Sequence, residues 1–565
     1  MTRGITRACA VLATSVLATT ATSLGVAGAD VVRTQGADTL SVRLLAFNDL
    51  HGSLLPPEGE RSKIMQADGS HTPAGGAAYL AAYVSQLRGQ ASNSLLYSVG
   101  DNWGSSALES AMFNDEPTVE LLNRMQINAS AIGNHELDDG LAEFRRMESG
   151  GCSADNACTF SPSFGGANFP LMAANMTYAD GTPATLPFTV NIVDGVPLGV
   201  IAIAASNTAQ IVAPDGVSNL KFGDEVEAID RTADVLDFFG VKAITVLLHR
   251  GDEPDIAGGP NDCNVTSGPA RDIALRASSK VDVIFTADSH QQYNCEYPDP
   301  AGNPRVVMQG ASHGRIVSVA DVVIDRTTRD VLRDQTSSFN QIVTHDISPD
   351  PDTAALAEKA WDAAAEVAQR PVGTITADLT RDQVPSGESA LGNLVADAQL
   401  AAGTPRGAQI ALTNPGGMRE DLDAGTVTYR QAHAVQPFGN SLEVLSITGA
   451  VLKDTLEQQF QFSPEYAAFE RILAPSAGFT YTLDRNAPAG SRVSDMRLNG
   501  ENINPDTVYR VAVNKFLSEG GDGFTALRSA TETAGAGTDL DALVALFTSG
   551  SPVSAPATDR IRTVG

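Results

Sequence analysis

The chain has 565 residues, more than one hydrophobic core usually organises, so we expect two or more domains. Its formal charge of −29 argues against a protein that binds long nucleic-acid backbones, so any phosphate substrate must be small, and the charge also favours the solubility of an exported protein. Hydrophobic residues make up 42% and charged residues 19%, and no later stretch approaches the roughly 20 apolar residues of a membrane span, so we expect a soluble body.

Residues 1–29 are typical of a secretory signal peptide. Arg3 and Arg7 precede an apolar run, and Ala27-Gly28-Ala29 provides small residues for cleavage. We therefore expect cleavage near Ala29 and a secreted, periplasmic or cell-surface protein, with a retained anchor helix as the alternative.

Cys9 lies inside this segment, which leaves four cysteines in the exported chain. An even number in an oxidising compartment favours disulfides over metal thiolates. Sequence proximity favours the pairs Cys152–Cys158 and Cys263–Cys295, although four cysteines allow three pairings.

From about residue 41 to residue 324, short β-branched or apolar runs alternate with helical segments, which predicts an α/β domain. The runs are 42–47, 95–99, 198–204, 243–248 and 281–286. Each ends before Asp, His, Asn or Gly, so polar side chains follow the carboxyl ends of strands, where open α/β sheets bind ligands.

The Ala-rich segment 352–370 predicts a helix that joins two domains, because good helix formers fill it and a proline follows. From residue 372 the pattern restarts with Gly- and Asn-rich loops around short apolar runs. This predicts a second α/β domain that reaches nearly to the C-terminus.

Five loops of the first half carry candidate metal ligands, and four of the eight histidines fall in them. Asp, Asn and His provide the oxygen and nitrogen donors of divalent metals. Asp49 and His51 point the same way in an extended segment, so both can reach one metal. The loops are Asn48-Asp49-Leu50-His51-Gly52, Gly100-Asp101-Asn102, Gly133-Asn134-His135-Glu136, Leu248-His249-Arg250-Gly251 and Ala287-Asp288-Ser289-His290.

These loops resemble those of the calcineurin-like metallophosphoesterases, specifically the 5′-nucleotidase family in its bacterial secreted nucleotidase and UDP-sugar hydrolase form. The resemblance implies a four-layer α/β/β/α metallophosphoesterase domain over residues 40–345, a linker helix over 346–371 and a C-terminal α/β nucleotide-binding domain over 372–565. It also implies two divalent cations, with the choice between zinc, manganese, cobalt and magnesium left open.

By the same resemblance, each expected ligand belongs to one of two metals, and phosphate esters are hydrolysed by attack of a metal-bound hydroxide. His135 would stabilise charge on the phosphoryl oxygens, and Asp138 would orient it and raise its pKa. Asp138 as a helix N-terminal residue favoured by the dipole is the alternative. The ligands would be Asp49, His51 and His290 for one metal, Asn134, His249 and Asp288 for the other, and Asp101 as the bridge.

One ligand departs from the family pattern, which has Gly-His-x-His where this chain has Ala287-Asp288-Ser289-His290. A carboxylate then replaces a neutral imidazole at position 288. The added negative charge favours harder metals such as manganese or magnesium over zinc and leaves reduced activity open.

Four segments of the second half resemble the family's substrate-binding domain, and they begin at Glu388, Asn414, Pro437 and Asn514. Aromatic faces would clamp the base, a carboxylate would accept hydrogen bonds from ribose hydroxyls, and an arginine would meet phosphate. Ordinary core packing is the alternative for the aromatic residues. The implied substrate-binding residues are Asn414, Gly417, Arg419, Phe438, Asn440, Phe516 and Asp522.

The second departure is an absent arginine. Many family members carry one just ahead of the Glu-Ser-x-x-Gly-Asn-Leu segment, where this chain has Pro385-Ser386-Gly387. One expected phosphate contact is therefore missing, which weakens any prediction of the preferred nucleotide.

We interpret the chain as a secreted 5′-nucleotidase with hinge motion at the helix over 352–370. A 2′,3′-cyclic nucleotide 2′-phosphodiesterase with 3′-nucleotidase activity and a UDP-sugar hydrolase are alternatives on the same scaffold. A non-catalytic secreted nucleotide-binding protein is an alternative from another class. A sulfur-oxidation hydrolase with the same two domains is a further alternative. We disfavour it, because Phe438 and Phe516 would have no evident role in it.

Overall fold

The computed structural model describes residues 38–152, 158, 160–460 and 470–564. The predicted signal peptide, residues 1–29, lies outside them. Both predicted disulfides, Cys152–Cys158 and Cys263–Cys295, are confirmed. Within the described ranges, no helix has both the length and the apolar character that crossing a membrane requires.

Two six-stranded sheets form the N-terminal half. In each sheet four neighbouring strands run parallel, and the remaining strand pairs are antiparallel. The first sheet has the order β16 (Ser337–Ile342), β15 (Ile316–Asp325), β1 (Thr39–Phe47), β4 (Ser94–Ser98), β5 (Ala129–Ala131) and β6 (Leu171–Met172). The second has the order β13 (Gln292–Pro298), β14 (Pro304–Gly310), β12 (Val283–Thr286), β11 (Ala243–Leu248), β9 (Val196–Ile203) and β8 (Phe188–Val193).

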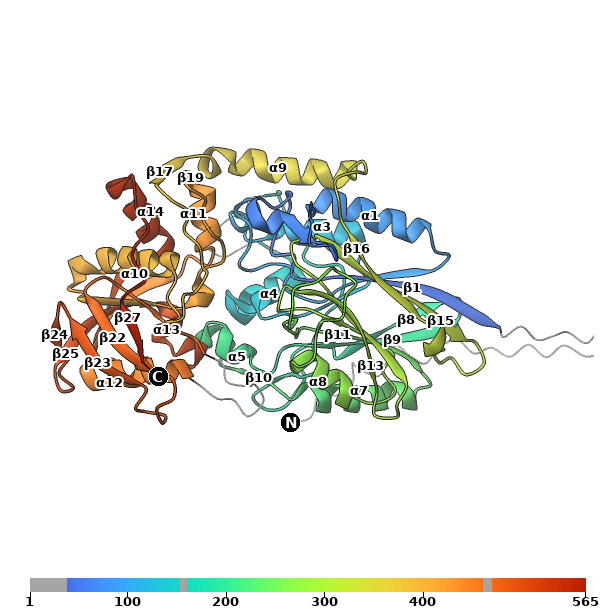
Figure 1. Ribbon diagram of the computed structural model, residues 1–565. Helices are drawn as coiled ribbons and strands as arrows, with labels where there is room; N and C mark the ends of the chain where they lie inside the picture. Colours follow the sequence, from blue (N-terminus) through green and yellow to red (C-terminus); the bar gives the residue numbers. More distant parts are fainter. Residues whose placement is uncertain (1–37, 153–157, 159, 461–469, 565) are drawn as a thin grey trace, which may run out of the picture. The chain divides into compact units, whose positions relative to one another are not determined.

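The two sheets and their helices form four layers, as Figure 1 shows. Successive residues of a strand point to opposite faces, so β1 directs Leu45 and Phe47 to one apolar cluster and Leu44 and Ala46 to another. The first cluster lies under α1 (Ala77–Gly89) and α3 (Glu116–Met125), the second lies between the sheets, and a third packs the second sheet on α7 (Glu225–Phe238) and α8 (Pro269–Arg276). The predicted α/β/β/α order is confirmed.

The predicted joining helix is present as α9 (Pro351–Ala368). The Asp350 side chain caps its N-terminus by accepting a hydrogen bond from the Thr353 amide at 2.8 Å. Leu356, Ala357 and Ala360 belong to the apolar cluster of the first sheet. The first turns of α9 are therefore part of the N-terminal half.

The C-terminal half is also α/β, as predicted, with a five-stranded and a four-stranded sheet. Helices α10 (Ala390–Gly403) and α14 (Asp539–Gly550) pack on each other, and α11 (Tyr429–Val435) faces the N-terminal half. The larger sheet has the order β21 (Ala474–Pro475), β18 (Ile410–Thr413), β25 (Val508–Asn514), β20 (Ser441–Thr448) and β26 (Thr533–Thr538). The smaller has the order β24 (Glu501–Asn502), β23 (Val493–Leu498), β22 (Phe479–Asp484) and β27 (Ile561–Val564).

Both halves belong to one compact unit, Thr39–Gly565. Arg430 of α11 joins them, because its guanidinium donates to Glu58 at 2.7 Å and to the buried Glu109 at 3.4 Å. The same group lies 5.3 Å from the ring centroid of Trp361 on α9. The Arg430 guanidinium thus links α11 to the N-terminal half and to the joining helix.

Candidate metal centre and nucleotide cavity

The expected metal ligands follow the carboxyl ends of five parallel strands, β1, β4, β5, β11 and β12. Backbone φ is positive at five of the seven: Asp49 (50°), His51 (49°), Asp101 (53°), Asp288 (75°) and His290 (59°). L-residues adopt this left-handed conformation at a cost, and such residues cluster at functional sites. The strained turns aim the side chains at one edge shared by the two sheets.

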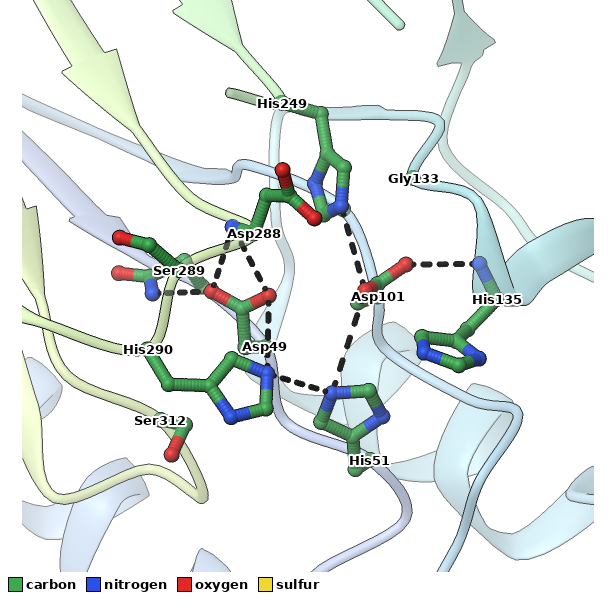
Figure 2. A network of polar contacts seen from close by, with 12 residues as sticks. Asp49, His51, Asp101, Gly133, His135, His249, Asp288, Ser289, His290 and Ser312 are labelled. Atoms are coloured by element: carbon green, nitrogen blue, oxygen red, sulfur yellow. Dashed lines mark hydrogen bonds and ion pairs between the residues drawn. The ribbon is translucent and has the colours of Figure 1, made fainter. Parts of the chain in front are cut away.

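Six of these seven side chains meet around a common centre, as Figure 2 shows: Asp49, His51, Asp101, His249, Asp288 and His290. His51 Nε2 lies 3.1 Å from His290 Nε2 and 3.9 Å from Asp101 Oδ2. His249 Nε2 lies 3.2 Å from the same Asp101 oxygen, and His290 Nε2 lies 3.6 Å from Asp49 Oδ1. Asp101 is therefore central, with imidazole nitrogens from both sheets directed at it.

The outer ring nitrogens fix how two of these imidazoles face the centre. His51 Nδ1 donates to the Gly104 carbonyl at 2.8 Å, and His249 Nδ1 donates to the Val99 carbonyl at 2.7 Å, because a carbonyl only accepts. In a neutral ring the Nε2 lone pair then faces the Asp101 carboxylate, so two acceptors meet unless a cation lies between them. Metal-binding histidines have this outer contact.

The charges of the cluster also call for cations. Burial raises the pKa of Asp49 to about 8, with further raising by the Asp101 charge and opposition from His249. Burial opposes a charge on His249, but the carboxylates of Asp101, Asp49 and Asp288 outweigh it and raise the pKa of that imidazole well above its ordinary value. The donor set therefore suits divalent metal ions, and three overlapping groups of its side chains have metal-binding spacing.

Asn134 and Asp288 line the same cavity as Asp101 but differ in their contacts. The Asn134 Oδ1 atom is buried with no hydrogen-bond partner among the described residues, as an oxygen reserved for a metal would be. The Asp288 amide donates to both Asp49 carboxylate oxygens at 3.1 and 3.2 Å, and its own carboxylate lies 3.4 Å from Arg250 Nη1. The carboxylate that departs from the family pattern is thus partly compensated by an arginine.

His135 forms the expected pair with Asp138, with 2.8 Å between Nδ1 and Oδ2. Burial opposes protonation, but the charges of Asp138 and Asp101 outweigh it and raise the pKa of His135. The His135 amide also donates to Asp101 Oδ1 at 2.9 Å. The backbone therefore ties His135 to the centre, and the side chain is held by Asp138.

A cavity of about 570 Å³ brings this centre together with the expected nucleotide-binding residues. Phe438, from the loop before β20, stacks on His135 with ring centroids 5.6 Å apart and an interplanar angle of 18°. All seven expected substrate-binding residues line the cavity: Asn414, Gly417, Arg419, Phe438, Asn440, Phe516 and Asp522. Asp101, Asn134, His135, Asp138, Asp288 and His290 line it from the other half.

Hydrogen bonds hold the expected ribose acceptor in place. Asp522 Oδ2 accepts from Asn414 Nδ2 at 2.9 Å, and Asn414 Oδ1 accepts from Asn514 Nδ2 at 3.0 Å. Asp522 Oδ1 forms an ion pair with Arg471. Asn440 donates weakly to the buried Asp539 at 3.4 Å.

Three residues of the site were missed by the sequence interpretation. The buried Glu136 carboxylate accepts from the amides of Asp101, Asn102 and Gly133 at 2.7 to 2.9 Å and so joins two metal-ligand loops. His313 lies with its ring 5.7 Å from that of His51 and donates its amide to the Asp49 carbonyl. Arg471 lines the cavity. Glu136 belongs to one of the five predicted ligand loops, whereas nothing in the local sequence singles out His313 or Arg471.

Two stacked sheets with Asp, Asn and His loops at a shared edge are the fold and site of a metallophosphoesterase. The family model for calcineurin-like phosphoesterases matches residues 42–292, and the one for the 5′-nucleotidase C-terminal domain matches residues 371–529. The chain belongs to the 5′-nucleotidase family. Calcineurin-like phosphoesterases use two divalent metal ions, and the Asp and His groups described above fit them.

Two curated proteins are similar to most of this chain. The chain is 32% identical to endonuclease YhcR of Bacillus subtilis over 492 residues, which are 86% of this chain and 38% of that protein. It is 30% identical to the cell wall protein Lmo0130 of Listeria monocytogenes over 545 residues, which are 87% and 65% of the two chains. The chain thus spans less than two thirds of either relative.

A solved structure supports the fold over nearly the whole chain. The 5′-nucleotidase precursor from Thermus thermophilus superposes with a TM-score of 0.75 at 25% identity. The match covers 93% of this chain and all of that one.

Proposed function

We propose that the protein is a metal-dependent 5′-nucleotidase, which removes phosphate from nucleoside 5′-monophosphates and from other small nucleotides. The observation that carries this proposal is one shared cavity of about 570 Å³, which is lined by residues of the candidate metal centre on one side and by Phe438, Phe516 and Asp522 on the other. A ligand that fills it touches both sets of groups.

In the metal assignment that we propose, two cations would share Asp101, and each would have three further ligands. Asp101 bridges, because imidazoles of both sheets face its Oδ2 atom. When bound, two divalent cations supply Lewis acidity to the phosphoryl oxygens and to an attacking water. Asp49, His51 and His290 hold one cation, and Asn134, His249 and Asp288 hold the other.

His135 is the proposed catalytic residue and Asp138 its positioning residue. The charged imidazole would donate a hydrogen bond to a phosphoryl oxygen, where negative charge grows as the bond to the leaving oxygen breaks. The 2.8 Å contact with Asp138 holds the ring and favours its charged form.

The C-terminal half supplies the nucleotide contacts in this proposal. Phe438 and Phe516 stack on the base, and Asp522 keeps carboxylate lone pairs for ribose hydroxyls beside its two protein partners. Arg419 has no hydrogen bond or ion pair of its guanidinium group within the described ranges, so its charge is available to phosphate. Asn414, Gly417 and Asn440 shape the same wall.

The proposed location is outside the cytoplasm. Two disulfides are typical of chains that fold in an oxidising compartment, and residues 1–29 have the pattern of a signal peptide. One relative is named a cell wall protein.

We place the hinge of the proposed two-domain enzyme at Gln369 and Arg370. Leu356, Ala357 and Ala360 anchor the start of α9 in the first core, and β17 (Pro371–Ile375) already pairs with β19 (Gly425–Thr428) of the second. Domain closure commonly gates turnover in such enzymes.

Phosphate release from AMP by the chain without residues 1–29, with manganese added, tests the proposal. We expect turnover that EDTA abolishes and manganese restores, and that Asp101→Ala and His135→Ala lower by at least about 100-fold. A panel with 2′,3′-cyclic AMP, 3′-AMP and UDP-glucose separates the alternative reactions. Tight nucleotide binding without turnover of any of them would favour the non-catalytic alternative.

A further inference from the structure

A second cavity, of about 850 Å³, adjoins the metal centre and has no part in the proposed mechanism. Residues of both halves line it, and it meets the nucleotide cavity at Ser105, Ser106 and Pro437, which line both. Among its described lining residues Arg430 is the one arginine and there is no lysine. We refer to it as the acidic cavity, because it is lined by Glu58, Glu109, Asp378, Glu420, Asp421 and Asp423.

Cations of the protein neutralise only part of this charge. The Arg430 guanidinium is shared by two carboxylates, since it donates to Glu58 at 2.7 Å and to Glu109 at 3.4 Å. Arg381, from outside the cavity wall, pairs with Asp421 at 2.9 Å. The wall as a whole therefore keeps a negative charge, which attracts cations and repels phosphate.

Glu109 gives the acidic cavity a buried carboxylate oxygen without a donor. The residue belongs to α2 (Leu108–Ala111), and its side chain is 1% exposed. Its Oε1 atom accepts from Arg430 of the same wall, so the carboxylate is directed at this cavity. Its Oε2 atom has no hydrogen-bond partner among the described residues. Buried polar atoms are normally satisfied, and a hydrated divalent cation is a partner that such an oxygen suits.

The acidic cavity reaches the metal centre at His51. Among the described residues, His51 lines the acidic cavity and not the nucleotide cavity, and its Nε2 atom lies 3.9 Å from Asp101 Oδ2. His313 lines the acidic cavity beside it, with ring centroids 5.7 Å apart. The Ala107 amide donates to the His51 carbonyl at 3.1 Å, which ties the start of α2, and so Glu109, to the His51 loop. Oxygen and nitrogen ligands thus continue from the wall to the centre.

We propose that the acidic cavity is an entry site for divalent cations, which binds hydrated metal ions and passes them to the metal centre at His51. The inference rests on the proposed metal assignment, in which His51 is a ligand. Arg419 and Arg471 line the nucleotide cavity, whereas carboxylates dominate the acidic one. Metal ions and nucleotides accordingly reach the same centre from two different cavities.

The first experiment measures how fast the EDTA-treated protein takes up manganese. Stopped-flow mixing with a fluorescent indicator of free manganese follows uptake without any turnover. Glu58 and Asp423 are exposed, so lysine at both positions should leave the fold intact. We expect Glu58→Lys combined with Asp423→Lys to slow uptake at least about tenfold at low salt, because a charged cleft raises association rates by about 10- to 1000-fold. At 1 M salt, where the Debye length is about 3 Å, the difference should fall below about threefold.

Equilibrium binding separates an entry site from a ligand of the bound metal. Carboxylates that only guide entry speed uptake and release alike, so the dissociation constant of manganese should change far less than the uptake rate. Glu109→Gln keeps an acceptor for Arg430 and removes the charge, and it should slow uptake in the same direction. A weakening of equilibrium affinity as large as the loss in rate would overturn the inference.

A matched control makes the same change of charge away from both cavities. Glu227 and Asp234 of α7 are 78% and 70% exposed and line neither cavity. Glu227→Lys combined with Asp234→Lys should therefore keep the uptake rate of the unmodified protein. Equal slowing in this variant would show that net charge, and not the acidic cavity, sets the rate.

Failure of this inference and failure of the proposed function give different results. An unchanged uptake rate in the Glu58 and Asp423 variant overturns the entry site, whatever the activity. If the unmodified protein takes up manganese faster than this variant but releases phosphate from no nucleotide, the proposed function fails and the entry site is supported. An unmodified protein that takes up no manganese contradicts both.

Discussion

The imidazole of His135 and the phenyl ring of Phe438 lie nearly parallel, with centroids 5.6 Å apart and 18° between the planes. One ring comes from the metal-centre half and the other from the nucleotide-binding half. The proposed base clamp therefore stacks on the proposed catalytic imidazole. Base recognition and catalysis share a contact surface.

We expect Phe438→Leu to raise the KM for AMP about tenfold, because one base stack contributes roughly 1–3 kcal/mol. Hydrolysis of p-nitrophenyl phosphate, which has no nucleobase, should change far less. Phe238→Leu is the matched control, since Phe238 is 83% exposed and lies outside the cavity. Equal losses for both substrates would mean that Phe438 acts on His135 and not on the base.

Asp138 is expected to act through His135. Asp138→Asn removes the charge that faces Nδ1 at 2.8 Å, so kcat should fall about 10- to 100-fold with little change in KM. The neighbouring Asp139 also lines the cavity but is not the partner of the imidazole, so Asp139→Asn should retain most of the activity. Steady-state kinetics on both variants measure the difference, and equal activities would remove the positioning role.

Asp288 should set the choice of metal. Asp288→His returns the imidazole of the family pattern and removes one negative charge, so zinc affinity should rise about tenfold or more relative to manganese affinity. Competitive metal titration of the EDTA-treated protein measures this ratio without any turnover. Asp288→Asn is the control for charge alone, and an equal shift in both variants would show that the ligand type is unimportant. Loss of the 3.4 Å pair with Arg250 is common to both.

The apolar pattern of the sequence predicted most of the strands that precede the ligand loops. β1, β4, β11 and β12 are largely apolar runs, so their ends indicated where four of the five ligand loops begin. β5 escaped prediction because Ala129-Ser130-Ala131 is short and carries no strand signal of its own. It becomes a strand through pairing with β4 and β6.

The sequence pattern could not predict which distant segments of the chain contact each other. The pairing of β1 with β15 joins residues near position 40 to residues near position 324. Likewise, Arg471 has no motif around it and reaches Asp522 only in the folded chain. The ligand residues could be chosen because their loops resemble those of a known family, whereas no motif surrounds Arg471 or His313.

We expect the buried His433 on α11 to make the folded chain less stable in mild acid. Burial, with repulsion from Arg430 added, lowers the pKa of His433 from 6.5 to about 4, and its Nδ1 has no hydrogen-bond partner among the described residues. The unfolded chain therefore binds more protons than the folded one between about pH 6.5 and pH 4, so stability is full above this window and falls as the pH falls through it. The loss from this residue is about 2 kcal/mol at pH 5, from 1.36 kcal/mol per unit of pKa.

Replacing the imidazole of His433 should remove this loss of stability in acid. In His433→Gln the drop in melting temperature between pH 7 and pH 5, measured by scanning calorimetry, should be smaller than in the unmodified protein. The comparison uses the difference between the two pH values, so a constant destabilisation by the new side chain cancels. His71 is exposed, and His71→Gln should keep the full drop. An unchanged drop in His433→Gln would show that other groups cause the acid sensitivity.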